Sequence, residues 1–167
     1  MATLTENTNF FQQAGFKVNV GRKNYPNFEF FAQSVSHPSV SLPAAENATT
    51  SRIQTVPQPG DTLTFDELSV IILLDEDFNS YVEIFNWMVR MVNTNQTSAY
   101  DARITEDGVP TFCDITVSAL SSHNNTSKKF IYRNAFPISL GNVDFEANST
   151  EILTVPVGFR YTYFDIA

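Results

Sequence analysis

The chain has 167 residues, a length that suits one domain with a full hydrophobic core. Its net charge of −8 argues against tight binding to nucleic-acid backbones, where Lys and Arg neutralise phosphates. A single cysteine excludes an internal disulfide and a cysteine metal cluster, and no stretch approaches the ~20 apolar residues of a membrane span.

The N-terminal part of the chain passes from a polar tail into strand-like segments. Residues 1–14 are mostly polar and predict a flexible N-terminal arm ahead of a single domain over 15–167. Apolar and polar residues then alternate over Phe16–Val20, which predicts a first strand. Residues 21–27 are rich in turn formers, and a second strand is predicted over Phe28–Val35.

Residues 36–60 are the least regular stretch and contain four prolines. Proline fixes φ and removes a hydrogen-bond donor, so a central strand is not expected here. A loop of this length usually carries function or is disordered. We therefore expect an extended excursion, with an edge strand at Arg52–Val56.

A strand and a helix are predicted next. Leu63–Leu74 becomes almost continuously apolar from Leu68, as in a strand buried on both faces. The acidic run Asp75–Asp77 supplies capping carboxylates for a helix over about 77–92. The predicted apolar face of this helix comprises Phe78, Tyr81, Val82, Phe85, Met88, Val89 and Val92.

The second half of the chain reads as further strands. A polar loop over 93–110 precedes a strand at Phe112–Leu120, in which Cys113 is expected to be a small core residue. Another strand begins at Lys128–Tyr132 and should end in a turn at Pro137–Asn142.

The closing run Ile152–Ile166 is the most regular part of the sequence. It alternates well, with one predicted face formed by Phe159, Tyr161 and Tyr163 and the other by Arg160, Thr162 and Phe164. No catalytic group lies in this run. It therefore indicates a surface that pairs with other strands.

No residue is predicted to be catalytic, to bind a cofactor or to ligate a metal. His37 and His123 read as exposed loop histidines without a nucleophile nearby. Asp75–Asp77 lacks the glycine and terminal Glu of a calcium loop, and helix capping explains it. Residues 21–23 lack the pattern of a phosphate loop, and Lys128–Lys129 reads as solvated charge.

Three segments carry a resemblance to a known family. They are NFEFFAQSVSHPSVSLP at 27–43, PGDTLTFDELSVIILLDEDFNSYVEIFNWM at 59–88, and the closing strand pair over Ile138–Ile166. Their order resembles the tail-tube proteins of contractile-tailed, T-even-like bacteriophages, including tube terminator and completion variants. The most characteristic part is an acidic turn leading into an amphipathic helix that ends near Trp87.

The resemblance implies a mainly β fold, a sandwich or barrel of six or seven antiparallel strands with one flanking helix. It implies a structural virion protein, made in the host cytoplasm, that forms a hexameric ring of the tail tube or its terminating ring. Double-stranded DNA would pass through the lumen without specific binding. Adjacent tube, sheath, baseplate or neck proteins would be partners, and residues 36–60 would contact the next ring.

Two other functions stay open at this point. A sandwich-type binding module would bind a carbohydrate or receptor through exposed aromatic residues such as Tyr25 or Tyr100. An enzyme would lose activity when His37 or His123 is replaced, although no reaction is indicated. Strands without a chemical site favour assembly over both, and subunit contacts would bury the exposed sheet edges.

Overall fold

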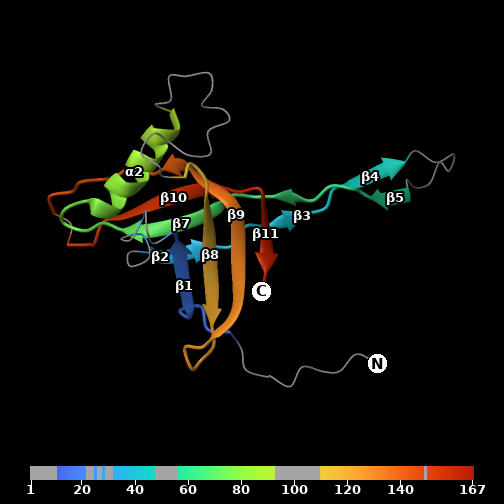
Figure 1. Ribbon diagram of the computed structural model, residues 1–167, viewed down its shortest axis with the longest axis horizontal. Coiled ribbons are helices and arrows are strands. Elements are labelled where there is room, and N and C mark those ends of the chain that lie inside the picture. Colours follow the sequence, from blue (N-terminus) through green and yellow to red (C-terminus); the bar gives the residue numbers. More distant parts are fainter. Residues whose placement is uncertain are drawn as a thin grey trace.

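The computed structural model describes residues 11–21, 25, 28, 32–47, 56–92, 110–148 and 150–167. Its strands are β1 (Phe16–Val20), β2 (Ala32–Ser36), β3 (Val40–Ser41), β4 (Ala44–Asn47), β5 (Val56–Pro59), β6 (Thr64–Phe65), β7 (Leu68–Leu73), β8 (Cys113–Leu120), β9 (Thr126–Leu140), β10 (Thr154–Arg160) and β11 (Tyr163–Ile166). The helix α2 spans Asn79–Val92. Figure 1 shows a body of crossed strands with α2 on one side and a thin strand pair extending away from it.

Seven strands form one antiparallel sheet, in the order β1-β8-β9-β10-β7-β2 with β11 paired to β9. The 15-residue strand β9 belongs to two layers. Its first half pairs with β8 and β11, which gives a front layer of β1, β8, β9 and β11. Its second half pairs with β10, and β7 and β2 complete a back layer. The mainly β class, the antiparallel sheet and the helix confirm the predicted fold.

The core lies between the two layers, and α2 contributes to it. Trp87 of α2 is 1% exposed and stacks on Tyr25 with ring centroids 4.4 Å apart. The Trp87 indole N–H donates to the Thr111 carbonyl at 2.9 Å. Phe159 of β10 meets Trp87 at 6.0 Å and Phe28 edge-on at 5.7 Å. Three elements far apart in sequence are therefore joined through these rings.

The predicted buried face of α2 is only partly correct, since Tyr81 and Met88 pack against the core. The fully buried residues of the helix are Ser80, Ile84 and Trp87. Four members of the predicted apolar face are instead exposed, namely Val82, Phe85, Val89 and Val92. Both faces of the helix carry apolar residues, so spacing alone could not select the one that packs on the sheet.

The start of the helix differs from the predicted position by two residues. Phe78 has a φ of 56°, outside the helical region, and α2 begins at Asn79. The predicted capping role of the acidic run is confirmed for Asp75. Its carboxylate accepts hydrogen bonds from the Ser80 backbone N–H at 3.4 Å and from the Asn79 side chain at 2.8 Å.

The strands near both ends of the chain are partly as predicted. β1 has the predicted bounds, and β8 begins one residue later than expected, with Cys113 buried as predicted. The strand expected from Phe28 is shorter, because β2 begins at Ala32 and Phe28 is helical. The predicted loop at 93–110 lies almost wholly outside the described residues.

The predicted turn at Pro137–Asn142 is wrong, because β9 continues through Pro137 to Leu140. Proline has no N–H for the ladder, and the register with β10 shifts opposite it, between Gly158 and Phe159. A side chain at Gly158 would collide with the Ser139 hydroxyl, so this close crossing needs glycine. A β-bulge therefore allows β9 to continue past Pro137.

The closing run is two strands rather than one. β10 ends at Arg160, and β11 begins at Tyr163 and pairs with the other half of β9. The alternation therefore breaks, and Tyr161 and Phe164 contact each other although they were assigned to opposite faces. The chain crosses here from the back layer to the front layer.

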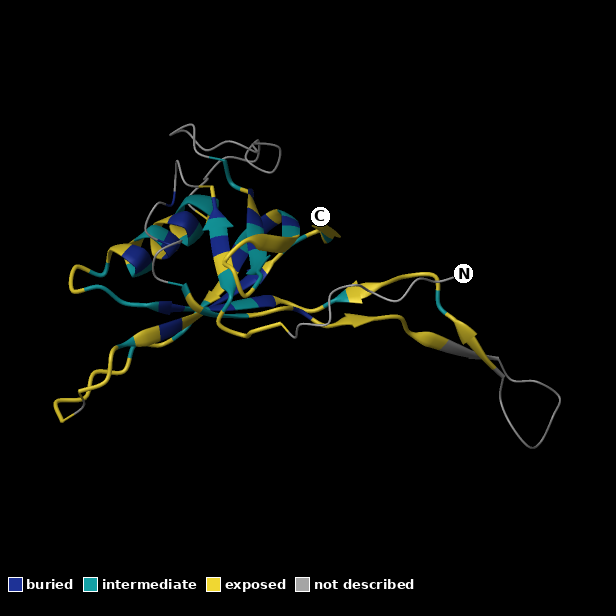
Figure 2. Ribbon diagram, turned by 90° about the horizontal axis from the view of Figure 1, so that it is seen from below, coloured by how far each residue is buried: buried dark blue, intermediate teal, exposed yellow. Residues whose placement is uncertain are grey.

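Two short strand pairs within residues 40–47 and 56–65 leave the body. β3 pairs with β6 and β4 pairs with β5, both antiparallel, and the prolines at 57 and 59 lie in β5. We call the described segments Val40–Asn47 and Val56–Phe65 the arm. Figure 2 shows the arm as an exposed ribbon that points away from the body. Most of the predicted edge strand Arg52–Val56 lies outside the described residues, and only Val56 belongs to β5.

Candidate assembly surfaces

The front layer ends in two strands, β1 and β11, whose outer edges pair with nothing in the described chain. Lys129 and Ala167 exchange two backbone hydrogen bonds, of 2.8 and 2.9 Å, across β9 and β11. Because such pairs alternate along an antiparallel ladder, Phe164 and Ile166 direct their backbone N–H groups outward. Both edges therefore present backbone groups that another strand could bind.

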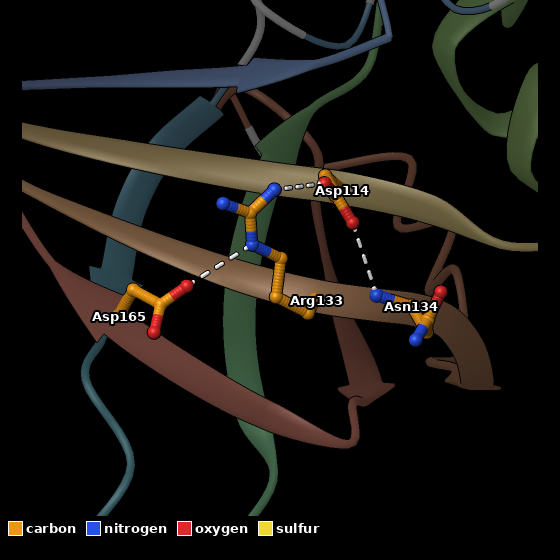
Figure 3. Close-up of polar contacts among 4 residues, drawn as sticks. All are labelled: Asp114, Arg133, Asn134 and Asp165. Atoms are coloured by element: carbon orange, nitrogen blue, oxygen red, sulfur yellow. Dashed lines mark hydrogen bonds and ion pairs between the residues drawn. The ribbon is translucent and has the colours of Figure 1, made fainter.

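An ionic cluster crosses three strands on the outer face of the front layer (Figure 3). Arg133 of β9 contacts Asp114 of β8 at 2.6 Å and Asp165 of β11 at 3.2 Å. Asp114 also accepts the backbone N–H of Asn134 at 3.1 Å, where φ is 52°. The hydrogen bonds that its guanidinium donates to the two carboxylates raise the pKa of Arg133. The cluster fixes β11, the last strand, to the middle of the layer.

The proximal part of the arm is a ribbon with two unlike faces. Ser41 and Thr64 lie opposite each other, and their hydroxyls hydrogen bond at 2.5 Å. The alternating positions carry Val40, Leu42, Leu63 and Phe65. Val40, Leu42 and Leu63 are 45%, 50% and 52% exposed. A two-stranded ribbon is marginal on its own, so this apolar face lacks the partner that would stabilise it.

Aromatic rings hold the part of the arm next to the body, around Phe65 and His37, which we call the arm root. Phe65 packs against Tyr161 and Phe164, with centroids 6.2 and 5.6 Å apart. His37 lies between the Phe130 and Phe164 rings and shares a 2.6 Å hydrogen bond between its Nδ1 and the Tyr132 hydroxyl. His37 is exposed and lies outside the strands, as predicted, but the contacts that join it to positions up to 95 residues away were not expected.

His37 makes the stability of the arm root depend on pH. The aromatic rings around it remove part of the solvent from the His37 ring, which lowers the pKa of His37 below its ordinary value. Its contribution to stability is therefore complete above the unfolded pKa of about 6.5 and is lost as the pH falls through the folded pKa. Replacing His37 with Asn should flatten this acidic limb in urea titrations between about pH 7 and 5.

The matched control for that variant is His123→Asn, because His123 is exposed in the β8–β9 turn and was predicted to be so. This control should keep the wild-type slope. An unchanged slope in the His37 variant would contradict the assignment.

An apolar stripe runs along the outer side of α2. Val82, Phe85, Val89 and Val92 follow one another at spacings of 3, 4 and 3 residues. This spacing is typical of a seam that packs against another helix. Phe145, 77% exposed, extends the stripe through its contact with Phe78 at 6.2 Å. The 3-4-3 spacing was visible in the sequence, but it was interpreted as a core face.

Acidic side chains surround one end of the stripe. Glu76, Asp77, Asp144 and Glu146 are all exposed. Hydrogen bonds from Asn79 and Ser80 outweigh the effect of burial and lower the pKa of Asp75, so this carboxylate stays charged as well. The surface therefore suits a partner with both apolar and basic residues.

The basic and aromatic residues considered in the sequence fall into exposed, buried and undescribed positions. Lys128 and Lys129 are exposed on β9, as predicted, whereas Arg22, Lys23 and Tyr100 lie outside the described residues. Tyr25 is buried against Trp87, so its expected role as an exposed ligand-binding aromatic is wrong. Within the described ranges, no three His, Cys, Asp or Glu side chains are grouped as metal ligands. No helix among them is long and apolar enough to cross a membrane.

The sequence and the fold both match known proteins. The family described as "Phage tail tube protein" matches residues 2–167. The tube-terminating cap of the anti-feeding prophage has a TM-score of 0.67 and 16% identity over 99% of this chain and 95% of that chain. The sheath–tube complex of an extracellular contractile injection system has a TM-score of 0.66 and 18% identity over 96% and 93%.

The sheath/tube terminator of the latter system gives the same TM-score and identity, over 96% of this chain and 99% of that chain. At such identities the likeness concerns the fold. No curated protein matches the sequence.

Proposed function

Because this chain belongs to the phage tail tube protein family, we propose that six copies close into a ring around the DNA channel of a contractile tail. The chain is a structural component of the virion tail, in the tube or in its terminating ring. The strand pairing and side-chain contacts of the front layer support a sixfold ring with a lumen.

The front layer supports closure because it has four strands and two open edges. Its strands alternate in direction, so β1 and β11 run opposite ways. In a ring, β11 of one copy would meet β1 of the next as an antiparallel pair. This even number of strands is the observation that carries the proposal, since the ladder continues through every junction without a parallel step.

The size of such a barrel suits a conduit. Six copies would contribute about 24 strands, spaced ~4.8 Å apart. With a strand tilt of about 40°, the barrel would measure ~48 Å across between backbones. Barrels of about 16–18 strands already leave an aqueous channel. A DNA duplex would therefore pass with room for side chains.

The outer face of the front layer would line this channel. It carries the Arg133 cluster, in which the guanidinium binds Asp114 and Asp165. An arginine held by two carboxylates in this way offers little net positive charge to a phosphate. The overall charge of −8 acts in the same direction, so DNA would slide without being bound.

The helix and the arm would then face other proteins. α2 contacts the back layer, because Trp87 meets Phe159 of β10 and the Ser80 hydroxyl donates to the Leu73 carbonyl of β7. A lumenal front layer would therefore leave the stripe of α2 on the periphery, toward surrounding tail proteins. The arm would reach a neighbouring subunit. No enzymatic activity is proposed, and the burial of Tyr25 removes one aromatic residue on which a glycan-binding alternative depended.

The ring is tested by size-exclusion chromatography with light scattering and by negative-stain microscopy of the purified protein. We expect rings with sixfold symmetry, or stacks of such rings, with a central hole. A protein that stays strictly monomeric at high concentration, under conditions in which it is folded by circular dichroism, would overturn the proposal.

A further inference from the structure

β11 is the least supported strand of the front layer. It has four residues, three of them exposed, and within the described chain it pairs along one edge only, with β9. Segments with few buried side chains open locally at a far lower free energy than the whole domain. The order of β11 therefore depends on the individual contacts that attach it to β9.

Arg133 of β9 attaches β11 at two points. Its backbone carbonyl accepts the N–H of Thr162 at 3.0 Å, where the chain passes from β10 to β11. Its side-chain Nε donates to the Asp165 carboxylate at 3.2 Å, in the second half of β11. The backbone bonds between Lys129 and Ala167 hold the far end of the strand. One residue of β9 therefore contacts both the start and the second half of β11.

The guanidinium of Arg133 is itself fixed to β8. Its Nη1 donates to Asp114 at 2.6 Å, and the other oxygen of Asp114 accepts the Asn134 N–H at 3.1 Å. Asn134 has a φ of 52°, a conformation that Asn adopts more readily than most residues. Because the donors of a guanidinium form a rigid fork, the contact with Asp114 directs Nε toward β11 (Figure 3). The side chain therefore sets the position of β11 relative to β8.

We propose that Arg133 is a positioning residue for ring closure, because it holds β11 in the conformation that pairs with β1 of the next copy. The inference rests on the proposed function and assigns one side chain to it. Phe164 and Ile166 direct their backbone N–H groups outward only while β11 is paired with β9. A subunit with a detached β11 offers no edge, and the apparent dissociation constant of a junction rises as the competent fraction of subunits falls.

Hydrogen exchange in unassembled subunits tests the first step. Arg133→Met removes the guanidinium and keeps an unbranched side chain. At a concentration below assembly, exchange should become at least about 5-fold faster at Asp165 and Ala167, whose N–H groups face β9. The matched control is Lys129→Met, which removes one positive charge from the same face of β9. It should leave the exchange of β11 unchanged.

Assembly followed by light scattering tests the second step. Arg133→Met and Asp165→Ala should each raise the concentration needed for half assembly at least about 5-fold, because fewer subunits carry an ordered β11. The double variant should resemble the weaker-assembling single variant, since the two residues act through one contact. Lys129→Met should assemble normally.

Global stability separates positioning from a general structural role. The ion pairs of Arg133 are partly exposed, and such pairs contribute little to unfolding of a whole domain. The melting temperature of the unassembled Arg133→Met and Asp165→Ala variants should therefore stay within about 2 °C of the unmodified protein. A melting temperature that falls in step with the loss of assembly would overturn the positioning role.

The remaining outcomes distinguish the two proposals. Unchanged exchange of β11 in Arg133→Met, or rings that form at the normal concentration, overturns the inference and leaves the proposed function intact. Assembly that Lys129→Met weakens as strongly also overturns the inference, because loss of charge alone would explain it. Absence of rings in the unmodified protein rejects the proposed function itself.

Discussion

Replacing Trp87 with Ala should lower the free energy of unfolding by about 3–5 kcal/mol, the usual cost of deleting a large buried ring. Trp87 is 1% exposed, stacks on Tyr25 and meets Phe159. Its loss would also remove the 2.9 Å hydrogen bond that the indole N–H donates to the Thr111 carbonyl. Urea or guanidinium unfolding followed by circular dichroism measures the change.

Phe85→Ala is the matched control on the same helix. The spacing of apolar residues predicted Phe85 for the core, whereas the structure leaves it 51% exposed. Its replacement should change the free energy of unfolding by no more than about 0.5–1 kcal/mol. A reversed order of the two effects would show that α2 packs through its other face and would contradict the described core.

Ile166→Pro should abolish ring formation while the subunit remains folded. Ile166 lies in β11 and directs its backbone N–H away from β9, toward the open edge. Proline removes that donor and places a ring at the edge, where strand pairing between copies is proposed. Light scattering should report monomers, and the far-ultraviolet circular dichroism spectrum should match that of the unmodified protein.

Two further variants serve as controls for this prediction. Ile166→Val keeps the N–H and should assemble normally. Asp165→Pro removes an inward N–H and the carboxylate that binds Arg133, so it should detach β11 and lower the melting temperature. Rings that persist with Ile166→Pro would mean that copies do not join through the edge of β11.

Local patterns were reliable where one element sufficed to define them. Alternation placed β1 and β8 within one residue, and the burial of Cys113 followed from its place in β8. The acidic run predicted a helix start because a cap needs only residues a few positions apart. The family resemblance correctly indicated the mainly β fold and the tail-tube role.

The predictions failed where both faces of an element are apolar or where the contacting residues lie far apart in the sequence. α2 has apolar residues on both sides, and only the sheet decides that Trp87 is buried and Phe85 is not. Pro137 predicted a turn, but a shift in the register between β9 and β10 allows β9 to continue through it. Nothing in the sequence around His37 indicated its hydrogen bond with Tyr132, because only the fold brings the two residues together.

The sequence by itself determined the strand-rich class and the helix, because these depend on residue types and short spacings. Tertiary structure alone decided which apolar residues form the core and which stay exposed on α2 and the arm. The physical reason is that burial depends on what packs against a side chain, and for Trp87 those neighbours, Tyr25 and Phe159, lie far along the chain.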